Sequence, residues 1–173
     1  VFTPDELRRN YSTLNKAALD YGWPTLPQAR GQIIFVMDGS GTEIADYIDG
    51  HANLQGRVMF VYGEEGQPET AFMKFEDPRG NEANIKRLVE LGYMIRTRAD
   101  ADTKEARNGD TSRRDAALNS GAQIVSTDFY RPDPRGNTTA GWTNYFVKLP
   151  DAIAARPNPV NTQHDRWVCT IDE

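Results

Sequence analysis

The sequence predicts an α/β protein with a parallel sheet, and two features of the chain lead to this prediction. Short apolar runs rich in β-forming residues alternate with helix-forming stretches from Pro4 to Asp128, which is typical of strands joined by crossover helices. Five of these runs end in charged or turn residues. In parallel α/β sheets and barrels, the carboxyl ends of the strands carry the active site, so these endings predict a shared polar edge.

Composition sets the outer limits of the interpretation. The 173 residues are enough for one domain with a buried core, and 38% hydrophobic and 26% charged residues are ordinary for a globular protein. A formal net charge of −5 argues against general nucleic-acid binding. No apolar run approaches the roughly 18 residues that span a bilayer, and no signal peptide is recognisable after Val1. Cys169, the only cysteine, can form no internal disulfide.

The first part of the chain is predicted to fold as a helix, a loop and a strand. The helix begins at Thr3–Glu6, where a capping residue precedes a proline and two acids. Apolar residues keep helical spacing as far as Tyr21, and Gly22-Trp23-Pro24 ends the helix. A loop from Pro27 to Gly31 then leads into the first strand, Gln32–Met37.

The middle of the chain continues the alternation. A short helix is expected over Thr42–Asp49, after a turn that begins at Asp38. The second and third strands are predicted at Val58–Tyr62 and Ala71–Met73, and a helix follows from Gly80 to Leu91.

The last predicted helices and strands are followed by a change in amino-acid composition. The fourth strand is Met94–Arg98, and residues 103–119 are expected to form one or two helical pieces with a break near Asn108-Gly109-Asp110. The fifth strand is Gln123–Asp128. From about residue 131 to residue 173, Pro, Gly, Asn and Asp predict a loop-rich tail, in which Asn144–Lys148 could form an edge strand.

The fourth strand carries the most informative pair of residues. Arg96 and Arg98 are two residues apart, so they point to the same face of an extended strand. Neighbouring guanidinium groups repel each other unless an anion or carboxylates lie between them, and arginine is well shaped for bidentate phosphate or carboxylate contact. Two interpretations follow: salt bridges to Asp100 and Asp102, or a site for an anionic substrate.

Common catalytic patterns are missing from the sequence. It has no glycine-rich phosphate loop between a strand and a helix, and no Gly-x-Ser-x-Gly turn. The two histidines, His51 and His164, lie in predicted loops far from any strand end. We expect them to be surface residues rather than metal ligands or bases.

Several long segments resemble one known family. Gly92–Thr103 is similar to its signature, as is Ser112–Leu118 running on to Ser120–Asp128, and Gly22–Leu26 and Ala71–Pro78 resemble it as well. The family is the calcium-dependent phosphoinositide-specific phospholipase C-like phosphodiesterases of bacteria and fungi. The resemblance extends from Phe2 to about Val160. It departs from the family at Arg156–Val160, where a proline stands in place of an expected cysteine, so a disulfide in the tail is not implied.

The resemblance implies a parallel (β/α) barrel of the TIM type, with a phosphodiesterase site at its carboxyl-end mouth. It implies that residues 1–173 supply the C-terminal portion of a single barrel domain, about the last five strands. The catalytic histidines and a Glu/Asp metal pair would lie on an N-terminal part that is missing from this chain.

The implied reaction is that of a phosphoric diester hydrolase. A base removes the proton of the inositol 2-hydroxyl, which attacks phosphorus, and an acid protonates the leaving diacylglycerol oxygen. Cations, either a metal or Arg and Lys, stabilise charge on the phosphoryl oxygens. The resemblance also implies Ca²⁺ as cofactor, a phosphoinositide substrate and a secreted or periplasmic location.

Two residues, at the ends of the first and third predicted strands, receive roles in this scheme. Asp38, at the end of the first strand, is a candidate calcium ligand, because Ca²⁺ prefers hard oxygen ligands; the alternative is an ordinary turn residue. Lys74, at the end of the third strand, is a candidate phosphate contact. The alternative for Lys74 is a salt bridge with Asp38 or Glu76.

The remaining site residues follow the fourth and fifth strands. Arg96 and Arg98 are the candidates for contacts with the substrate phosphate and the inositol hydroxyls. Asp128 is the candidate catalytic carboxylate, because in a closed barrel it would lie beside a histidine on the first strand and could orient its imidazole. The alternative for Asp128 is a cap for the following loop.

Four other residues have open interpretations. Trp142 and Tyr145 could line the mouth or touch lipid, or they could pack under a loop. Arg113 and Arg114 are expected on a solvated helix face, or paired with Glu105 and Asp110.

Two competing functions remain beside the phospholipase. One is a non-catalytic half-barrel that binds a partner through its open sheet edges. The other is a glycerophosphodiester phosphodiesterase of the same fold. Peripheral contact with a membrane is compatible with all three functions, and a transmembrane segment or a nucleic-acid partner is not expected.

Overall fold

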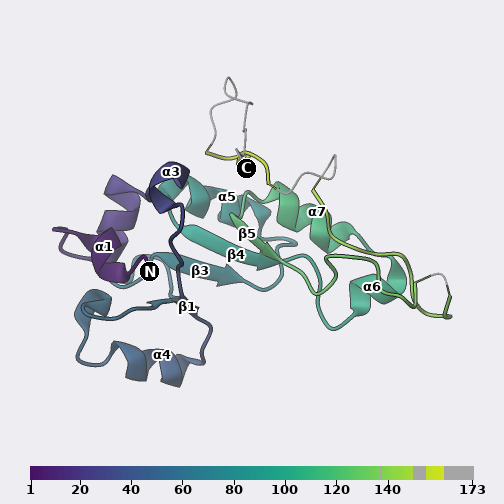
Figure 1. Cartoon of the computed structure of the whole chain (residues 1–173), viewed down its shortest axis with the longest axis horizontal. Coiled ribbons are helices and arrows are strands. Elements are labelled where there is room, and N and C mark those ends of the chain that lie inside the picture. Colours follow the sequence, from purple (N-terminus) through teal and green to yellow (C-terminus); the bar gives the residue numbers. More distant parts are fainter. Residues whose placement is uncertain (137, 150–154, 162–173) are drawn as a thin grey trace. The chain divides into compact units, whose positions relative to one another are not determined.

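The computed structural model describes residues 1–136, 138–149 and 155–161, and Figure 1 shows the elements along the chain. The chain divides into two compact units. The first unit comprises Val1–Lys74 together with Leu91–Met94, and the second comprises Phe75–Glu90 together with the residues from Ile95 onwards.

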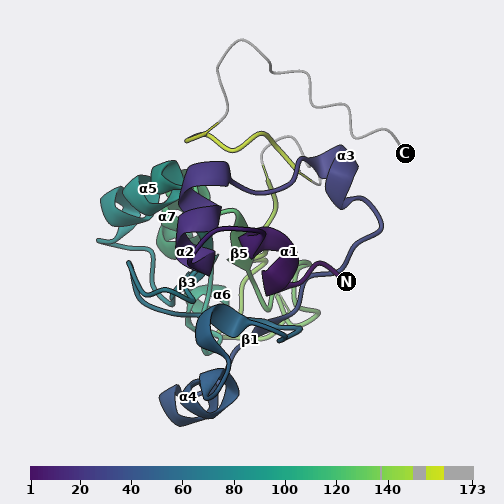
Figure 2. The same cartoon turned by 90° about the vertical axis from the view of Figure 1, so that its left-hand side faces the viewer.

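The first unit begins with three short helical segments: α1 (Pro4–Arg8), α2 (Leu14–Lys16) and the π-helical η1 (Ala17–Tyr21). The predicted cap of α1 is confirmed, since Thr3 and Glu6 form a reciprocal capping box. The prediction of one continuous helix is wrong. Arg9 ends α1 with a φ of 50°, a region that interrupts a right-handed helix. Figure 2 shows α1 and α2 next to each other.

Two more helices of this unit test the sequence prediction in opposite ways. The helix α4 (Gly41–Ile48) agrees with the expected helix and is capped by Ser40 and Glu43. The helix α3 (Leu26–Ala29) stands where a loop was predicted. Its first turn tolerates Pro27, and the Gln28 side chain accepts the backbone N–H of Thr25 at 2.9 Å, so a short capped helix forms there. A 3₁₀ turn, η2 (Ala52–Leu54), follows α4.

Five strands occur in the described residues: β1 (Val36–Met37), β2 (Phe60–Val61), β3 (Phe72–Phe75), β4 (Met94–Arg98) and β5 (Ile124–Ser126). The registered pairs β1–β2 and β4–β5 are both parallel, and a parallel bridge joins Tyr62 to Phe72. The predicted parallel α/β class is therefore confirmed. The strands form a two-stranded sheet, β1-β2, and a three-stranded sheet, β3-β4-β5, so the described residues do not close into a barrel.

Strand lengths differ most from prediction at the first strand. The sequence predicts Gln32–Met37, but only two residues are paired in β1. Ile33, Ile34 and Phe35 are all at least 39% exposed. An apolar run becomes a strand only where another strand accepts its hydrogen bonds, and the described neighbour β2 is equally short. The fourth strand, by contrast, has the predicted bounds.

The core of the first unit is a cluster of buried apolar side chains from its helices and strands. Trp23 packs edge-on against Phe72, with 5.1 Å between ring centroids, and its indole N–H donates to the Gly92 carbonyl at 2.9 Å. Gly92 has a φ of 111°, and a Cβ there would lie 2.9 Å from the carbonyl oxygen of Ala18, so only glycine fits. The buried members are Phe2, Leu7, Leu14, Ala18, Leu54, Phe60, Val61, Ala71 and Phe72.

Three helices occur in the described residues of the second unit: α5 (Glu82–Leu91), α6 (Lys104–Asn108) and α7 (Ser112–Asn119). The predicted break between α6 and α7 is confirmed, because Gly109 ends α6 in the left-handed conformation. The buried side of α5 carries Ile85, Leu88 and Val89. Figure 1 shows α7 alongside β5, and β4 leading towards α6.

The tail is irregular where it is described. Residues 131–136, 138–149 and 155–161 contain no helix or strand, so the expected edge strand at Asn144–Lys148 is wrong. Isolated hydrogen bonds hold this segment instead, such as the one from the Val147 N–H to the Phe129 carbonyl at 2.8 Å. His164 and Cys169 lie outside the described residues. None of the described helices has the length and apolar character needed to cross a bilayer.

Candidate functional site

The predicted site residues divide between the two units. Asp38 and Lys74 belong to the first unit, and Arg96, Arg98 and Asp128 belong to the second. Each group is brought together within its own unit.

Asp38 and Lys74 form a close ion pair in the first unit. The Lys74 ammonium lies 2.5 Å from the Asp38 carboxylate, at the ends of β3 and β1. Lys74 also lies 5.5 Å from the centroid of the Tyr62 ring. A salt bridge between Lys74 and Asp38 was one of the alternatives that the sequence analysis gave for Lys74. Whether Asp38 binds metal and Lys74 binds phosphate stays a prediction.

The two arginines of β4 share one carboxylate, that of Glu76. Arg96 Nη1 lies 3.1 Å from Glu76 Oε1, and Arg98 Nη1 lies 3.6 Å from Glu76 Oε2. Arg98 also reaches the Asp128 carboxylate at 3.4 Å. The guanidinium pair is therefore bridged by an anion, as the repulsion argument requires.

The partners of these arginines correct the sequence interpretation. Salt bridges to Asp100 and Asp102 were one of the two interpretations, but Asp102 instead pairs with Lys104 at 3.1 Å. The backbone reverses after Asp100, because Asp102 and Thr103 both have positive φ. Glu76 is the residue that sequence reasoning missed. Its only signal was its place at the end of the third strand, beside the fourth.

The four charged side chains of this cluster are open to solvent to different degrees. Arg96 and Arg98 are 18% and 27% exposed, and the Glu76 and Asp128 carboxylates are 51% and 68% exposed. Two partly covered cations thus face two open carboxylates, and the formal charges cancel. An incoming anion could replace the Glu76 carboxylate between the guanidinium groups at a small cost, since exposed ion pairs are weak.

A buried carboxylate supports the end of β5. Asp100 is fully buried and accepts the backbone N–H of Asp128 at 2.9 Å and the hydroxyl of Thr127. The Tyr145 hydroxyl lies 3.4 Å from the same carboxylate and donates to the Ala99 carbonyl at 3.0 Å. Burial, together with the nearby charge of Asp100, raises the pKa of Tyr145 above its usual range.

The aromatic residues of the tail pack rather than point into the mouth. Tyr145 is buried and meets Phe129 edge-on at 5.9 Å, which confirms the packing interpretation for Tyr145. The Trp142 ring lies between two guanidinium groups, with Arg135 at 3.6 Å and Arg107 at 4.5 Å from its centroid.

The arginines of α7 differ from each other. Arg113 is buried and lies 3.5 Å from Glu105, so the solvated interpretation is wrong for Arg113 and the pairing with Glu105 is confirmed. Arg114 pairs with the next residue, Asp115, at 2.8 Å. His51, as expected, lies outside the site in the first unit, where its Nδ1 is 2.8 Å from the Gln55 carbonyl.

The described residues do not form a calcium site by themselves. No group of three or more His, Cys, Asp or Glu side chains in that part of the chain could hold a metal ion. Asp38 offers one carboxylate, and the Lys74 ammonium already lies against it. Calcium takes six to eight oxygen ligands, so a Ca²⁺ ion at Asp38 would need most of its ligands from other residues.

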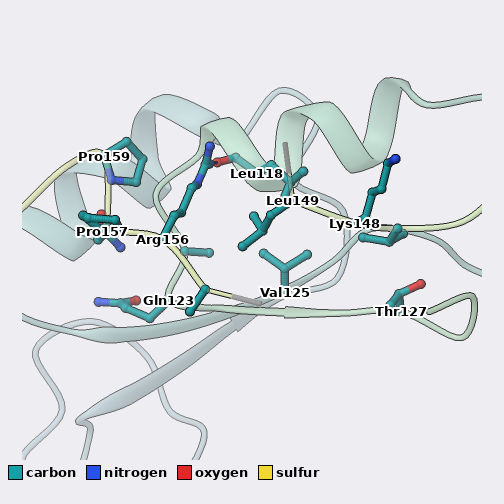
Figure 3. Close-up of a pocket in the computed structure, with 13 residues that line it drawn as sticks. Leu118, Gln123, Val125, Thr127, Lys148, Leu149, Arg156, Pro157 and Pro159 are labelled. Atoms are coloured by element: carbon teal, nitrogen blue, oxygen red, sulfur yellow. Dashed lines mark hydrogen bonds between the residues drawn. The ribbon is translucent and has the colours of Figure 1, made fainter. Parts of the chain in front are cut away.

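A cavity of about 590 Å³ lies on the other side of β5 from Asp128. Figure 3 shows it between α7 and β5, with Leu118 above and Gln123, Val125 and Thr127 along the strand. Alternate residues of a strand face opposite sides, so this cavity is separate from the face that carries Ser126 and Asp128. Pro157, which replaces the expected cysteine, lines the cavity.

One comparison with known proteins identifies the family. Residues 1–159 match the family described as phosphoinositide phospholipase C, Ca²⁺-dependent. The chain belongs to this family. No curated protein and no solved structure matches it. Membership of the phosphoinositide phospholipase C family supports a phospholipase C-like function and dependence on calcium, and it agrees with the parallel strands of the structure.

Proposed function

We propose that this chain carries the phosphate-binding part of a calcium-dependent phospholipase C site that cleaves phosphoinositides. Arg96 and Arg98 bind the phosphodiester, and a phosphate contact of Lys74, which belongs to the first unit, stays a separate prediction. The reaction is the attack of the inositol 2-hydroxyl on phosphorus with departure of diacylglycerol. Membership of the family supports this reaction class.

The single observation that carries the proposal is the position of the Glu76 carboxylate. It lies between the guanidinium groups of Arg96 and Arg98, at 3.1 Å and 3.6 Å. A carboxylate that lies between two arginines supports the proposal, because guanidinium groups bind the oxygens of phosphate as they bind those of a carboxylate. When phosphate takes this place, both cations face the oxygens on which charge develops during cleavage.

Asp128 has the second role. Its carboxylate is 68% exposed and its backbone is tied to the buried Asp100. A fixed backbone with an open carboxylate is what a residue needs to orient an imidazole. We assign the imidazole to a histidine outside residues 1–173, because His51 belongs to the other unit and its ring makes a local contact with the Gln55 carbonyl.

The missing strands of the barrel are the expected partner. Ile33, Phe35 and Val58 are exposed beside β1 and β2, and an uncovered apolar strand edge is normally covered by another strand. The same N-terminal part would supply the histidines and most calcium ligands, with Asp38 as one further ligand. A secreted or periplasmic location follows from this proposal, since its substrate is an extracellular lipid.

An equilibrium titration tests the phosphate site. Inositol 1-phosphate is added to the 173-residue chain and heat is recorded, for the unchanged chain, for Arg98→Gln and for Arg87→Gln. Arg87 lies on α5 and is the matched control, since it loses the same charge outside the site. Losing one charge-assisted contact should weaken binding by about tenfold in Arg98→Gln alone. Equal affinities in the two variants would refute the assignment.

A turnover assay then separates the proposed activity from its alternatives. The chain is combined with the histidine-bearing strands, and release of diacylglycerol from phosphatidylinositol vesicles is compared with cleavage of glycerophosphoinositol. Cleavage of the lipid with calcium supports the phospholipase. Cleavage of the water-soluble diester alone would favour a glycerophosphodiesterase, and no cleavage of either would favour a binding module.

A further inference from the structure

Helix α7 carries a buried arginine that the proposed site does not itself use. The side chain of Arg113 is only 8% exposed, although it is the second residue of the helix. Burying a guanidinium group is costly unless it is paired and hydrogen-bonded. The contacts of the Arg113 guanidinium therefore show which groups compensate for the cost of its burial.

The guanidinium of Arg113 contacts the turn that follows β3. Its Nη2 donates to the main-chain carbonyl of Glu76 at 2.5 Å, and its Nε lies 3.9 Å from the Asp77 carboxylate. Arg79 contacts the same turn, with its Nη2 2.7 Å from Asp77. Asp77 therefore lies near both guanidinium groups, and Arg113 also holds the Glu76 carbonyl.

The same guanidinium is paired with a buried carboxylate from helix α6. Arg113 Nη1 lies 3.5 Å from Glu105, whose side chain is 4% exposed. Glu105 in turn accepts the backbone N–H of Ala101 at 2.9 Å, in the segment that follows β4. The pair of Arg113 and Glu105 thus joins the turn after β3 to the turn after β4.

We infer that Arg113 is a positioning residue of the phosphate site: by holding the Glu76 carbonyl, it sets where the Glu76 carboxylate lies between Arg96 and Arg98. This inference rests on the proposed function, since it concerns the same arginines. The Glu76 carboxylate occupies the place that phosphate would take, so it competes with substrate. Arg113 controls that competition without touching the phosphate.

A double-mutant cycle with inorganic phosphate tests the inference. In the unchanged chain, Glu76→Gln should tighten phosphate binding by roughly two- to fivefold, because it removes the competing charge of an exposed ion pair. In Arg113→Lys, the ammonium still faces Glu105 but cannot also reach the Glu76 carbonyl and Asp77. There, Glu76→Gln should have little or no effect on the phosphate dissociation constant.

Arg114→Lys is the matched control, because Arg114 is the next residue of the same helix and pairs only within that helix in its described contacts. In this background Glu76→Gln should keep its full effect. An equal effect of Glu76→Gln in Arg113→Lys and Arg114→Lys would overturn the inference, because it would show that the Glu76 carboxylate keeps its place without Arg113.

A ligand-free measurement keeps this test separate from the proposed function. The side-chain NMR resonances of Arg96 and Arg98 should move on Glu76→Gln in the Arg114→Lys background and stay in place in the Arg113→Lys background. If phosphate fails to bind the unchanged chain, the proposed function is refuted, and these resonances still decide the role of Arg113. If Arg113→Lys does not fold, the double variant Arg113→Met/Glu105→Met removes both buried charges together and takes its place in the cycle.

Discussion

The buried carboxylate of Asp100 accepts the backbone N–H of Asp128 at 2.9 Å. Asp100 lies two positions after the end of β4, and Asp128 lies two positions after the end of β5. Asp100 is fully buried, whereas the Asp128 side chain is 68% exposed. The buried Asp100 carboxylate therefore fixes the backbone of Asp128, whose own carboxylate is exposed. Several consequences of this arrangement can be tested.

Asp100→Asn should destabilise the fold. The asparagine amide has the same size, but its NH₂ group would face the Thr127 hydroxyl or the Asp128 N–H, which are both donors in the present arrangement. Leaving a buried donor unsatisfied costs about 1–3 kcal/mol. Urea unfolding measures this loss. Asp102→Asn is the control, because Asp102 is exposed on the same turn and should change stability by less than about 0.5 kcal/mol. Similar losses in the two variants would show that Asp100 has no special structural role.

Glu105→Gln should be more damaging than the loss of any exposed acid. It would leave the buried guanidinium of Arg113 without its nearest carboxylate. Removing one partner of a buried ion pair costs roughly 3–5 kcal/mol. The free energy of unfolding of Glu90→Gln, an exposed position on α5, provides the reference. If Glu105→Gln unfolds at the same denaturant concentration as Glu90→Gln, Arg113 does not depend on Glu105.

The carboxyl group of Asp133 should titrate at unusually low pH. Hydrogen bonds from the Arg135 side chain and backbone lower the pKa of Asp133 to about 2. A lowered pKa in the folded state means that the associated stability is present above the unfolded pKa, about 3.9, and is lost as the pH falls through about 2. NMR of the side-chain carboxyl gives the midpoint directly.

Arg135→Gln is the variant that checks the cause of this shift. It should raise the midpoint of Asp133, because the guanidinium donors are gone, and it should change the fluorescence of Trp142, against which Arg135 lies at 3.6 Å. A midpoint that stays near 2 in this variant would assign the shift to something other than Arg135.

Asp38 and Lys74 offer a test of the calcium proposal. If Asp38 is a calcium ligand in the complete site, Asp38→Asn should raise the calcium concentration needed for half-maximal turnover by about tenfold or more. Lys74→Gln removes the competing ammonium, 2.5 Å away, and should lower that concentration. Shifts in the same direction for both variants would indicate that the ion pair is structural and that neither residue competes with calcium.

Predictions from the sequence were confirmed where residues that are neighbours in the chain determine the local structure. Strand β4 has its predicted bounds, and burial alternates along it, with Ile95 and Thr97 on the buried face. The cap at Thr3 and the glycine break after α6 depend only on neighbouring residues, so both can be predicted directly from the sequence. The arginine pair required an anion between its members, and one is present.

The identity of that anion could not be read from the sequence. Asp100 and Asp102 were the nearest acids along the chain, yet Glu76, about twenty positions away, bridges Arg96 and Arg98. For Arg113 the sequence left a solvated helix face and a pairing with Glu105 open, and its burial was not expected, because charged residues are seldom buried. Only the pairing of Arg113 with Glu105 and the Glu76 carbonyl makes its burial tolerable.

The parallel α/β class, the family and the candidate residues could all be predicted from the sequence, because periodicity, caps and long motifs are local properties of a chain. Which charged groups form pairs depends on the folded structure. Ion pairs and buried hydrogen bonds depend on distances between segments that are far apart in the chain, as in the contacts of Glu76 with Arg98 and of Asp100 with Asp128. Those distances exist only once the strands and turns are in place.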